Sequence, residues 1–103
     1  VRGMAHITGG GLCDNVPRVL PNHLDARFDR AAWTVPAIFQ FIQEAGGVDR
    51  EEMYRVFNMG IGLVVMVAQK DADAALKLLK AERQRPKLIG EVVSGSGKSV
   101  LAG

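Results

Sequence analysis

Three consecutive glycines at positions 9–11 constrain this chain more than any other feature of its sequence. Glycine loses more conformational freedom on folding than any other residue, so such a run is kept where φ must be positive or where a ligand contacts the backbone. An apolar segment, 4–7, precedes the glycines, and Pro17 follows at a spacing that suits the first turn of a helix. A strand, a glycine loop and a helix in this order predict an anion-binding loop. A tight turn that merely needs glycine is the alternative, because short glycine motifs are not specific.

Polar residues on both sides of the glycines are the candidate ligand contacts. His6 and Thr8 are two residues apart in the expected strand, so their side chains point to one face. His6 is either a candidate catalytic residue that faces the ligand or a hydrogen-bonded interior histidine. Asp14 or Asn15 is expected to cap the helix, and Arg18 offers a guanidinium for phosphate or carboxylate. The candidate substrate- or phosphate-binding residues of this loop are Thr8, Gly9, Gly10, Gly11, Asn15 and Arg18.

A second glycine-rich turn, 58–62, opens the most strand-like run of the chain. Its candidate binding residues are Asn58, as a polar contact, with Gly60 and Gly62. The alternative for the two glycines is crowding of the backbone within a sheet. Glycine loops at strand ends gather where the backbone must approach a ligand, so we expect this turn to lie beside the loop at 8–11.

The periodicity of apolar residues predicts an α+β chain with four helices. The helices are expected over 15–20, 35–45, 50–57 and 71–83. Thr34 is expected to cap the second helix, and Asp49 with Glu52 has the spacing of a capping box for the third. In the fourth helix Ala72, Ala75, Leu76 and Leu79 face inward, while the charged side chains form a solvated face.

The predicted strands form one small mixed or antiparallel sheet over 2–7, 61–68, 88–93 and 98–102. The last two are expected to be hairpin partners around the turn at 94–97. The run at 61–68 lacks clean alternation, which predicts a strand covered on both faces. Residues 26–28 are expected to form at most a short edge strand.

Composition excludes several classes of function. A formal charge of +2, with basic residues scattered among acids, does not predict nucleic-acid binding. The single cysteine, Cys13, cannot form an internal disulfide, which favours a reducing, cytoplasmic location for a soluble protein, and no membrane segment is expected. No residues have the spacing of a metal site. Gly97-Lys98-Ser99 is interpreted as a turn, because a phosphate loop requires glycine where Val92 stands.

Three runs together resemble a known enzyme family. HITGGG at 6–11, NVPRVLP at 15–21 and EMYRVFNMGIG at 52–62 are similar to phosphoribosylformylglycinamidine cyclo-ligase, also called AIR synthetase. The spacing of Trp33, Pro36 and Phe39 also matches that family. The resemblance covers essentially the whole chain, and its combined length makes it far more specific than any glycine motif alone. The run at 52–62 favours AIR synthetase over related FGAM synthetase, selenophosphate synthetase and thiamin-monophosphate kinase.

The resemblance implies a purine-biosynthesis enzyme that converts formylglycinamidine ribonucleotide to aminoimidazole ribonucleotide. ATP would activate the substrate amide oxygen as a phosphate ester, and a nitrogen would displace it to close the ring. The implied fold is a three-layer α/β/α domain with partial ferredoxin-like topology, in an enzyme that is a homodimer.

Residues 1–103 are expected to be the latter part of the family's C-terminal domain, incomplete at its N-terminus and inactive alone. The resemblance implies that a missing N-terminal half holds most of the ATP and magnesium contacts. Part of one face of the sheet is accordingly expected to be apolar and uncovered. A non-catalytic ligand-binding or dimerising α/β module is the alternative, because no base or nucleophile stands at recognisable spacing.

Overall fold

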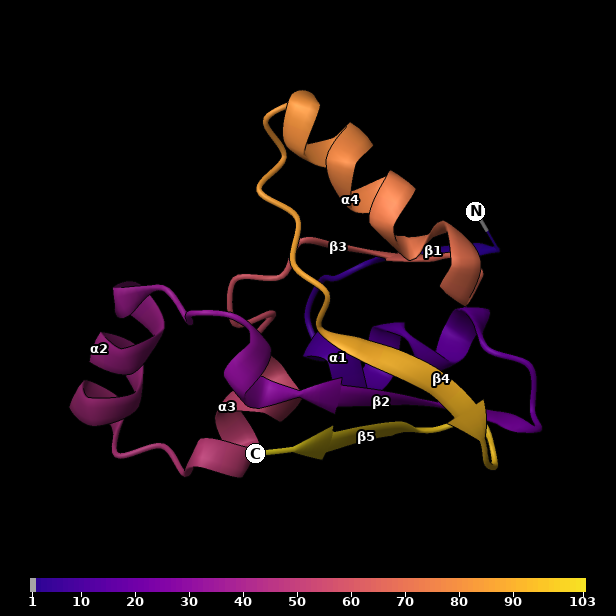
Figure 1. Cartoon of the computed structure of the whole chain (residues 1–103). Helices are drawn as coiled ribbons and strands as arrows, with labels where there is room; N and C mark the ends of the chain where they lie inside the picture. The colour runs from indigo at the N-terminus through magenta and orange to yellow at the C-terminus, as the bar shows by residue number, and fades with distance from the viewer. Residues whose placement is uncertain (1) are drawn as a thin grey trace.

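The chain folds into helices and two small sheets, which the computed structural model describes over residues 2–103 (Figure 1). The α+β class and the mixture of parallel and antiparallel pairing are confirmed. Short 3₁₀ turns, labelled η, connect some of the elements. In chain order the elements are β1 (Gly3–His6), α1 (Gly11–Asn15), η1 (Pro17–Val19), β2 (Leu24–Asp29), η2 (Arg30–Ala32), α2 (Ala37–Gly46), α3 (Arg50–Val56), β3 (Leu63–Met66), η3 (Gln69–Asp71), α4 (Ala72–Ala81), β4 (Gly90–Ser94) and β5 (Ser99–Ala102).

The strands pair in two separate sheets, so the prediction of one sheet is wrong. β1 pairs antiparallel with β3, with His6 opposite Leu63. In the other sheet β2 lies between β4 and β5, antiparallel to β4 and parallel to β5. The segment around 26–28 is therefore part of a central strand, not an edge strand. The strands predicted at 88–93 and 98–102 are not hairpin partners, because β2 separates them.

Asp25 explains why β2 enters between the two arms of the expected hairpin. Its carboxylate accepts hydrogen bonds from the backbone N–H groups of Ser96 (2.8 Å) and Lys98 (2.9 Å). The N–H groups of Gly95 and Gly97 donate to backbone carbonyls at the start of β2. The turn between β4 and β5 therefore satisfies its donors on β2 rather than on itself. Ala26 and Phe28 then alternate into the core, which fixes the register of the central strand.

One hydrophobic core joins the two sheets. α1 lies beside β5, where the Ser99 hydroxyl donates a hydrogen bond to the Leu12 carbonyl (2.8 Å). The following turn, η1, lies beside β1. The buried side chains come from both sheets and from the segments between them: Ala5, Ile7, Leu12, Val16, Leu20, Ala26, Phe28, Trp33, Met53, Tyr54, Met59 and Val64.

Three of the four predicted helices are confirmed, but their capping is not as predicted. In α4 the four residues expected to face inward are half-buried, and the charged ones are exposed. Neither Thr34 nor Asp49 caps a helix with its side chain, since α2 begins after Pro36 and α3 has no side-chain cap bond. The helix predicted over 15–20 is instead split into α1 and η1. Pro17 does stand at the first position of η1.

The β1–β3 sheet has an open outer face. Met4 and Leu63 are 57% and 56% exposed, and His6 is exposed on the same face because it lies opposite Leu63. The prediction that 61–68 is covered on both faces is wrong, since this sheet has two strands and Val64 alone of its β3 residues is fully buried. Part of this face, at Met4 and Leu63, is apolar and uncovered, as expected. Within residues 2–103, each helix is too short or too polar to span a bilayer.

The hydrogen bonds from Ser96 and Lys98 hold the pKa of the Asp25 carboxyl below its ordinary value. The charge therefore stabilises the fold fully above pH about 4, the unfolded pKa, and this stabilisation is lost as the pH falls through the folded pKa. We expect Asp25→Asn to lower the Tm at pH 7 and the difference from the parent to shrink as the pH falls below about 4. Circular dichroism melts over this range measure it, with the exposed Glu91→Gln as the matched control. Equal Tm values for Asp25→Asn and the parent at pH 7 would contradict the role of Asp25.

Candidate functional site

The glycine loop is shaped by close packing against the end of α3. Gly10 and Gly11 have φ of 95° and 59°, in the left-handed region that favours glycine. A Cβ at Gly11 would collide with the carbonyl oxygens of Tyr54 and Phe57, and one at Gly10 with the Asp14 side chain. The tight-turn interpretation therefore accounts for both of these glycines.

Gly9 differs from the other two glycines of the loop. A Cβ at this position would have no atom within 4 Å outside its chain neighbours, so neither packing nor a positive φ requires glycine here. Gly9 is exposed, as is Thr8 before it. Of the three glycines, Gly9 alone leaves open space beside the backbone.

Asn15 holds the loop from inside the protein. Its side chain is buried: Oδ1 accepts a hydrogen bond from the Thr8 hydroxyl (3.0 Å), and Nδ2 donates to the carbonyls of Gly11 (2.8 Å), Thr8 (3.2 Å) and Gly9 (3.4 Å). The prediction that Asn15 caps a following helix is wrong, because α1 begins at Gly11 and Asn15 is its last residue. With both amide hydrogens used by the loop, Asn15 positions the backbone.

The loop and the second turn line a small cavity of about 240 Å³, which is a shallow hollow open to the solvent. The prediction that the two glycine-rich segments lie side by side is confirmed, since both line this cavity. The Asn58 side chain accepts a hydrogen bond from the Gly60 N–H (2.8 Å), which shapes the turn. The cavity is lined by Thr8, Gly9, Phe39, Val56, Phe57 and Asn58.

The other predicted site residues lie outside this lining. His6 is exposed on the outer face of the β1–β3 sheet, and Arg18 is exposed in η1. Gly60 has φ of 95°, and a Cβ there would collide with the Pro36 ring, so its glycine is explained by packing. The Gly62 carbonyl accepts a hydrogen bond from the Ile7 N–H (2.9 Å), which joins the second turn to the strand before the glycine loop.

Trp33 holds the second turn, a role that sequence reasoning missed. Its indole Nε1 donates a hydrogen bond to the Met59 carbonyl (3.1 Å), and both side chains are buried. Met59 has φ of 54°, an uncommon conformation for a non-glycine residue. The sequence did contain a signal for this role, because a buried tryptophan needs an acceptor for its indole N–H.

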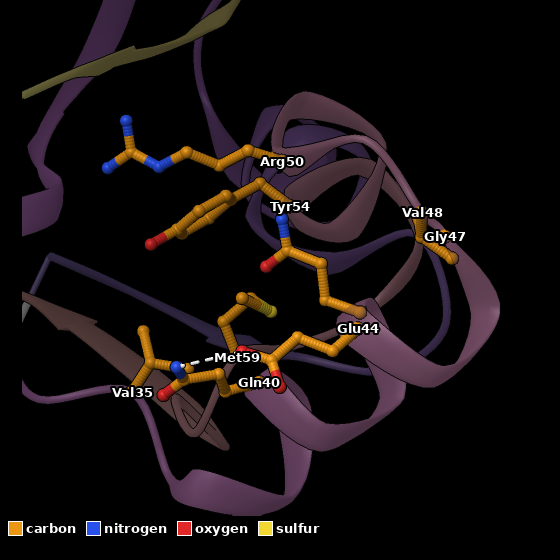
Figure 2. Close-up of a pocket in the computed structure, with 9 residues that line it drawn as sticks. Val35, Gln40, Glu44, Gly47, Val48, Arg50, Tyr54 and Met59 are labelled. Atoms are coloured by element: carbon orange, nitrogen blue, oxygen red, sulfur yellow. Dashed lines mark hydrogen bonds between the residues drawn. The ribbon is translucent and has the colours of Figure 1, made fainter.

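A larger cavity of about 540 Å³ lies between α2 and α3 (Figure 2). Arg50 lies over the Tyr54 ring, with 5.9 Å from its guanidinium carbon to the ring centroid, and Gln40 donates a hydrogen bond to Glu44 (3.2 Å). None of the predicted site residues line it. Its lining consists of Val35, Gln40, Gln43, Glu44, Gly47, Val48, Arg50, Tyr54 and Met59. We take the smaller cavity as the candidate site, because it alone exposes the backbone of the glycine loop.

Other reactive groups do not form a site in the described part of the chain. Burial raises the pKa of the Cys13 thiol, and the Asp14 carboxylate raises it further, which favours the unreactive thiol at neutral pH. Residues 2–103 contain no group of three His, Cys, Asp or Glu side chains that could hold a metal ion. The Gly97-Lys98-Ser99 run leads into β5 and not into a helix, and the N–H of Lys98 donates to the Asp25 carboxylate.

The fold and the loop geometry can now be compared with known proteins. Residues 1–103 match the family described as AIR synthase related protein, C-terminal domain. The chain belongs to this family.

One relative gives a more specific comparison than the family does. The chain is 46% identical over 101 residues to phosphoribosylformylglycinamidine cyclo-ligase of Thermoanaerobacter sp. (strain X514). The match covers 98% of this chain and 30% of the relative, so the chain spans less than a third of that protein's length.

The hydrogen bonds of Asn15 predict a large loss of stability when its amide is removed. In Asn15→Ala the carbonyls of the loop lose their buried donor, so we expect the free energy of unfolding to fall by about 1–3 kcal/mol. Urea unfolding followed by fluorescence measures the change. The exposed Asn22→Ala is the matched control and should stay within about 0.5 kcal/mol of the parent. Equal losses in the two variants would contradict the role of Asn15.

The glycines of the loop should differ sharply in their tolerance of alanine. Gly11→Ala forces a methyl group against two backbone carbonyls at positive φ, so we expect a loss of about 2 kcal/mol or more. Gly9→Ala adds a methyl group in open space, and we expect a change of less than about 1 kcal/mol. Thermal and urea unfolding of both variants test the difference. Comparable stability of the two variants would show that Gly11 does not pack as described.

Proposed function

We propose that this chain forms part of an ATP-dependent cyclo-ligase that converts formylglycinamidine ribonucleotide to aminoimidazole ribonucleotide. The observation that carries the proposal is the 46% identity to the Thermoanaerobacter cyclo-ligase across 98% of the chain. The proposed role of the chain is to form one wall of the substrate site. Thr8, Gly9 and Asn58 would contact the ribonucleotide, while Asn15 and Trp33 hold the backbone that carries them.

The residues of the candidate site do not fit a magnesium ion. Magnesium is held by oxygen ligands, usually carboxylates together with nucleotide phosphates, and the wall of the cavity has no carboxylate. The proposal therefore assigns ATP and magnesium mainly to parts of the longer protein outside the matched segment. The cavity wall also has no histidine, cysteine, lysine or carboxylate that could transfer a proton or act as a nucleophile. This supports the proposal that the chain alone is inactive.

The remaining parts of the proposal follow from the family. The active protein would be a cytoplasmic homodimer with a small-molecule ribonucleotide as substrate. His6 and Arg18 stay candidates for contacts outside the cavity, where a facing part of the longer protein could bring ligand atoms to them. Both side chains are exposed, as such a role requires.

A chimera tests the proposed function directly. This chain would replace the matching segment of the Thermoanaerobacter cyclo-ligase, and ADP release dependent on formylglycinamidine ribonucleotide would be measured. We expect the chimera to turn over within about tenfold of the intact relative and the isolated chain to be inactive. The relative without the segment is the control. Turnover by the isolated chain, or a folded but inactive chimera, would contradict the proposal.

A further inference from the structure

Two backbone donors of the glycine loop, the N–H groups of Thr8 and Gly9, make no hydrogen bond in the described part of the chain. Asn15 binds the Thr8 carbonyl, and in a trans peptide the following N–H, that of Gly9, points the opposite way. The next peptide follows the same geometry: the Gly9 carbonyl faces Asn15, while the Gly10 N–H donates to the Val56 carbonyl at 3.1 Å. Within residues 2–103, the Gly9 N–H makes no such hydrogen bond. It is therefore available in the cavity wall that Gly9 forms.

Asn58, which also lines the cavity, carries a second donor. Its Oδ1 is occupied by the Gly60 N–H, which fixes the orientation of the amide. The Nδ2 group consequently keeps its hydrogens for another acceptor. The Trp33 indole donates a buried hydrogen bond to the carbonyl of Met59, the next residue. This bond fixes the backbone that carries the Asn58 side chain.

The surroundings of these two donors are uncharged. Phe39 and Phe57, with ring centroids 5.9 Å apart, and Val56 form the apolar part of the wall. The cavity lining contains neither lysine nor arginine. A phosphate dianion placed here would find no countercharge in the lining. A neutral carbonyl oxygen needs only hydrogen-bond donors, and it gains from the adjacent apolar wall.

We propose that the cavity binds an uncharged carbonyl oxygen, of the formamide or amide class, through the Gly9 N–H and the Asn58 Nδ2. The inference rests on the proposed function and refines it: the formyl-amide end of the substrate enters this cavity, and the ribose phosphate binds elsewhere. At Gly9, the proposal replaces the sequence-based hypothesis of an anion-binding loop with recognition of an uncharged hydrogen-bond acceptor.

Two small probes distinguish the neutral acceptor from phosphate. The ¹⁵N-labelled 103-residue chain is titrated with N-formylglycinamide and separately with inorganic phosphate at equal ionic strength. We expect N-formylglycinamide to shift the Gly9 amide and the Asn58 side-chain NH₂ signals saturably, and phosphate to leave both unchanged at equal concentration. Saturable shifts of these signals by phosphate, or none by N-formylglycinamide, would overturn the inference.

A variant tests the second donor. Asn58→Asp keeps an oxygen for the Gly60 N–H but removes the NH₂ group, so the turn is retained and binding of N-formylglycinamide should weaken at least tenfold. Asn22→Asp adds the same charge on an exposed loop and should bind like the parent. Affinity of Asn58→Asp within twofold of the parent would overturn the assignment. The chimera assay is independent: an active chimera with no N-formylglycinamide binding refutes this inference alone, and an inactive chimera refutes the proposed function.

Discussion

The candidate site depends on the close approach of Gly11 to the last turn of α3. The carbonyls of Tyr54 and Phe57 occupy the space where any side chain at position 11 would lie. The Gly10 N–H adds a hydrogen bond to the Val56 carbonyl across the same contact. This packing brings the start of α1 against α3, and the exposed backbone of the loop therefore meets Asn58 just after α3. Only glycine permits this contact, and through it two segments far apart in the sequence line one cavity.

Two buried side chains then hold the halves of the cavity in place. Asn15 fixes the first loop through carbonyls, and Trp33 fixes the second turn through the Met59 carbonyl. Each is polar, buried and hydrogen-bonded, so moving either segment would leave a buried donor unpaired. The hydrogen-bonding groups left for a ligand in the cavity are those that the Asn15 and Trp33 side chains do not bind. Rigid support of this kind keeps a binding geometry constant without further contacts from the ligand.

Local patterns predicted the elements of the fold better than their arrangement. The amphipathic period of α4 and the turn at 58–62 are local features, and both predictions agree with the structure. The predicted hairpin of 88–93 with 98–102 failed because Asp25 bonds to Ser96, 71 residues later, which no local pattern indicates. Asn15 was mistaken for a cap because asparagine before proline suits a helix start, whereas its side chain turns back to residues 8–11. The glycine run pointed to a loop that lines the candidate site but could not separate Gly9 from the two glycines that packing requires.

The separation of charge from the cavity supports the role proposed for this chain as one wall of a larger site. Its cationic and titratable candidates, Arg18 and His6, lie on exposed surfaces, while the cavity presents neutral donors and aromatic rings. Neutral donors beside an apolar wall bind most strongly when a ligand excludes water, because hydrogen bonds strengthen at low dielectric. Such a wall selects the shape and the acceptor pattern of a substrate but cannot neutralise its phosphate. In the proposed enzyme the countercharges for phosphate groups would therefore come from outside the cavity, either from exposed residues such as Arg18 or from the facing part of the longer protein.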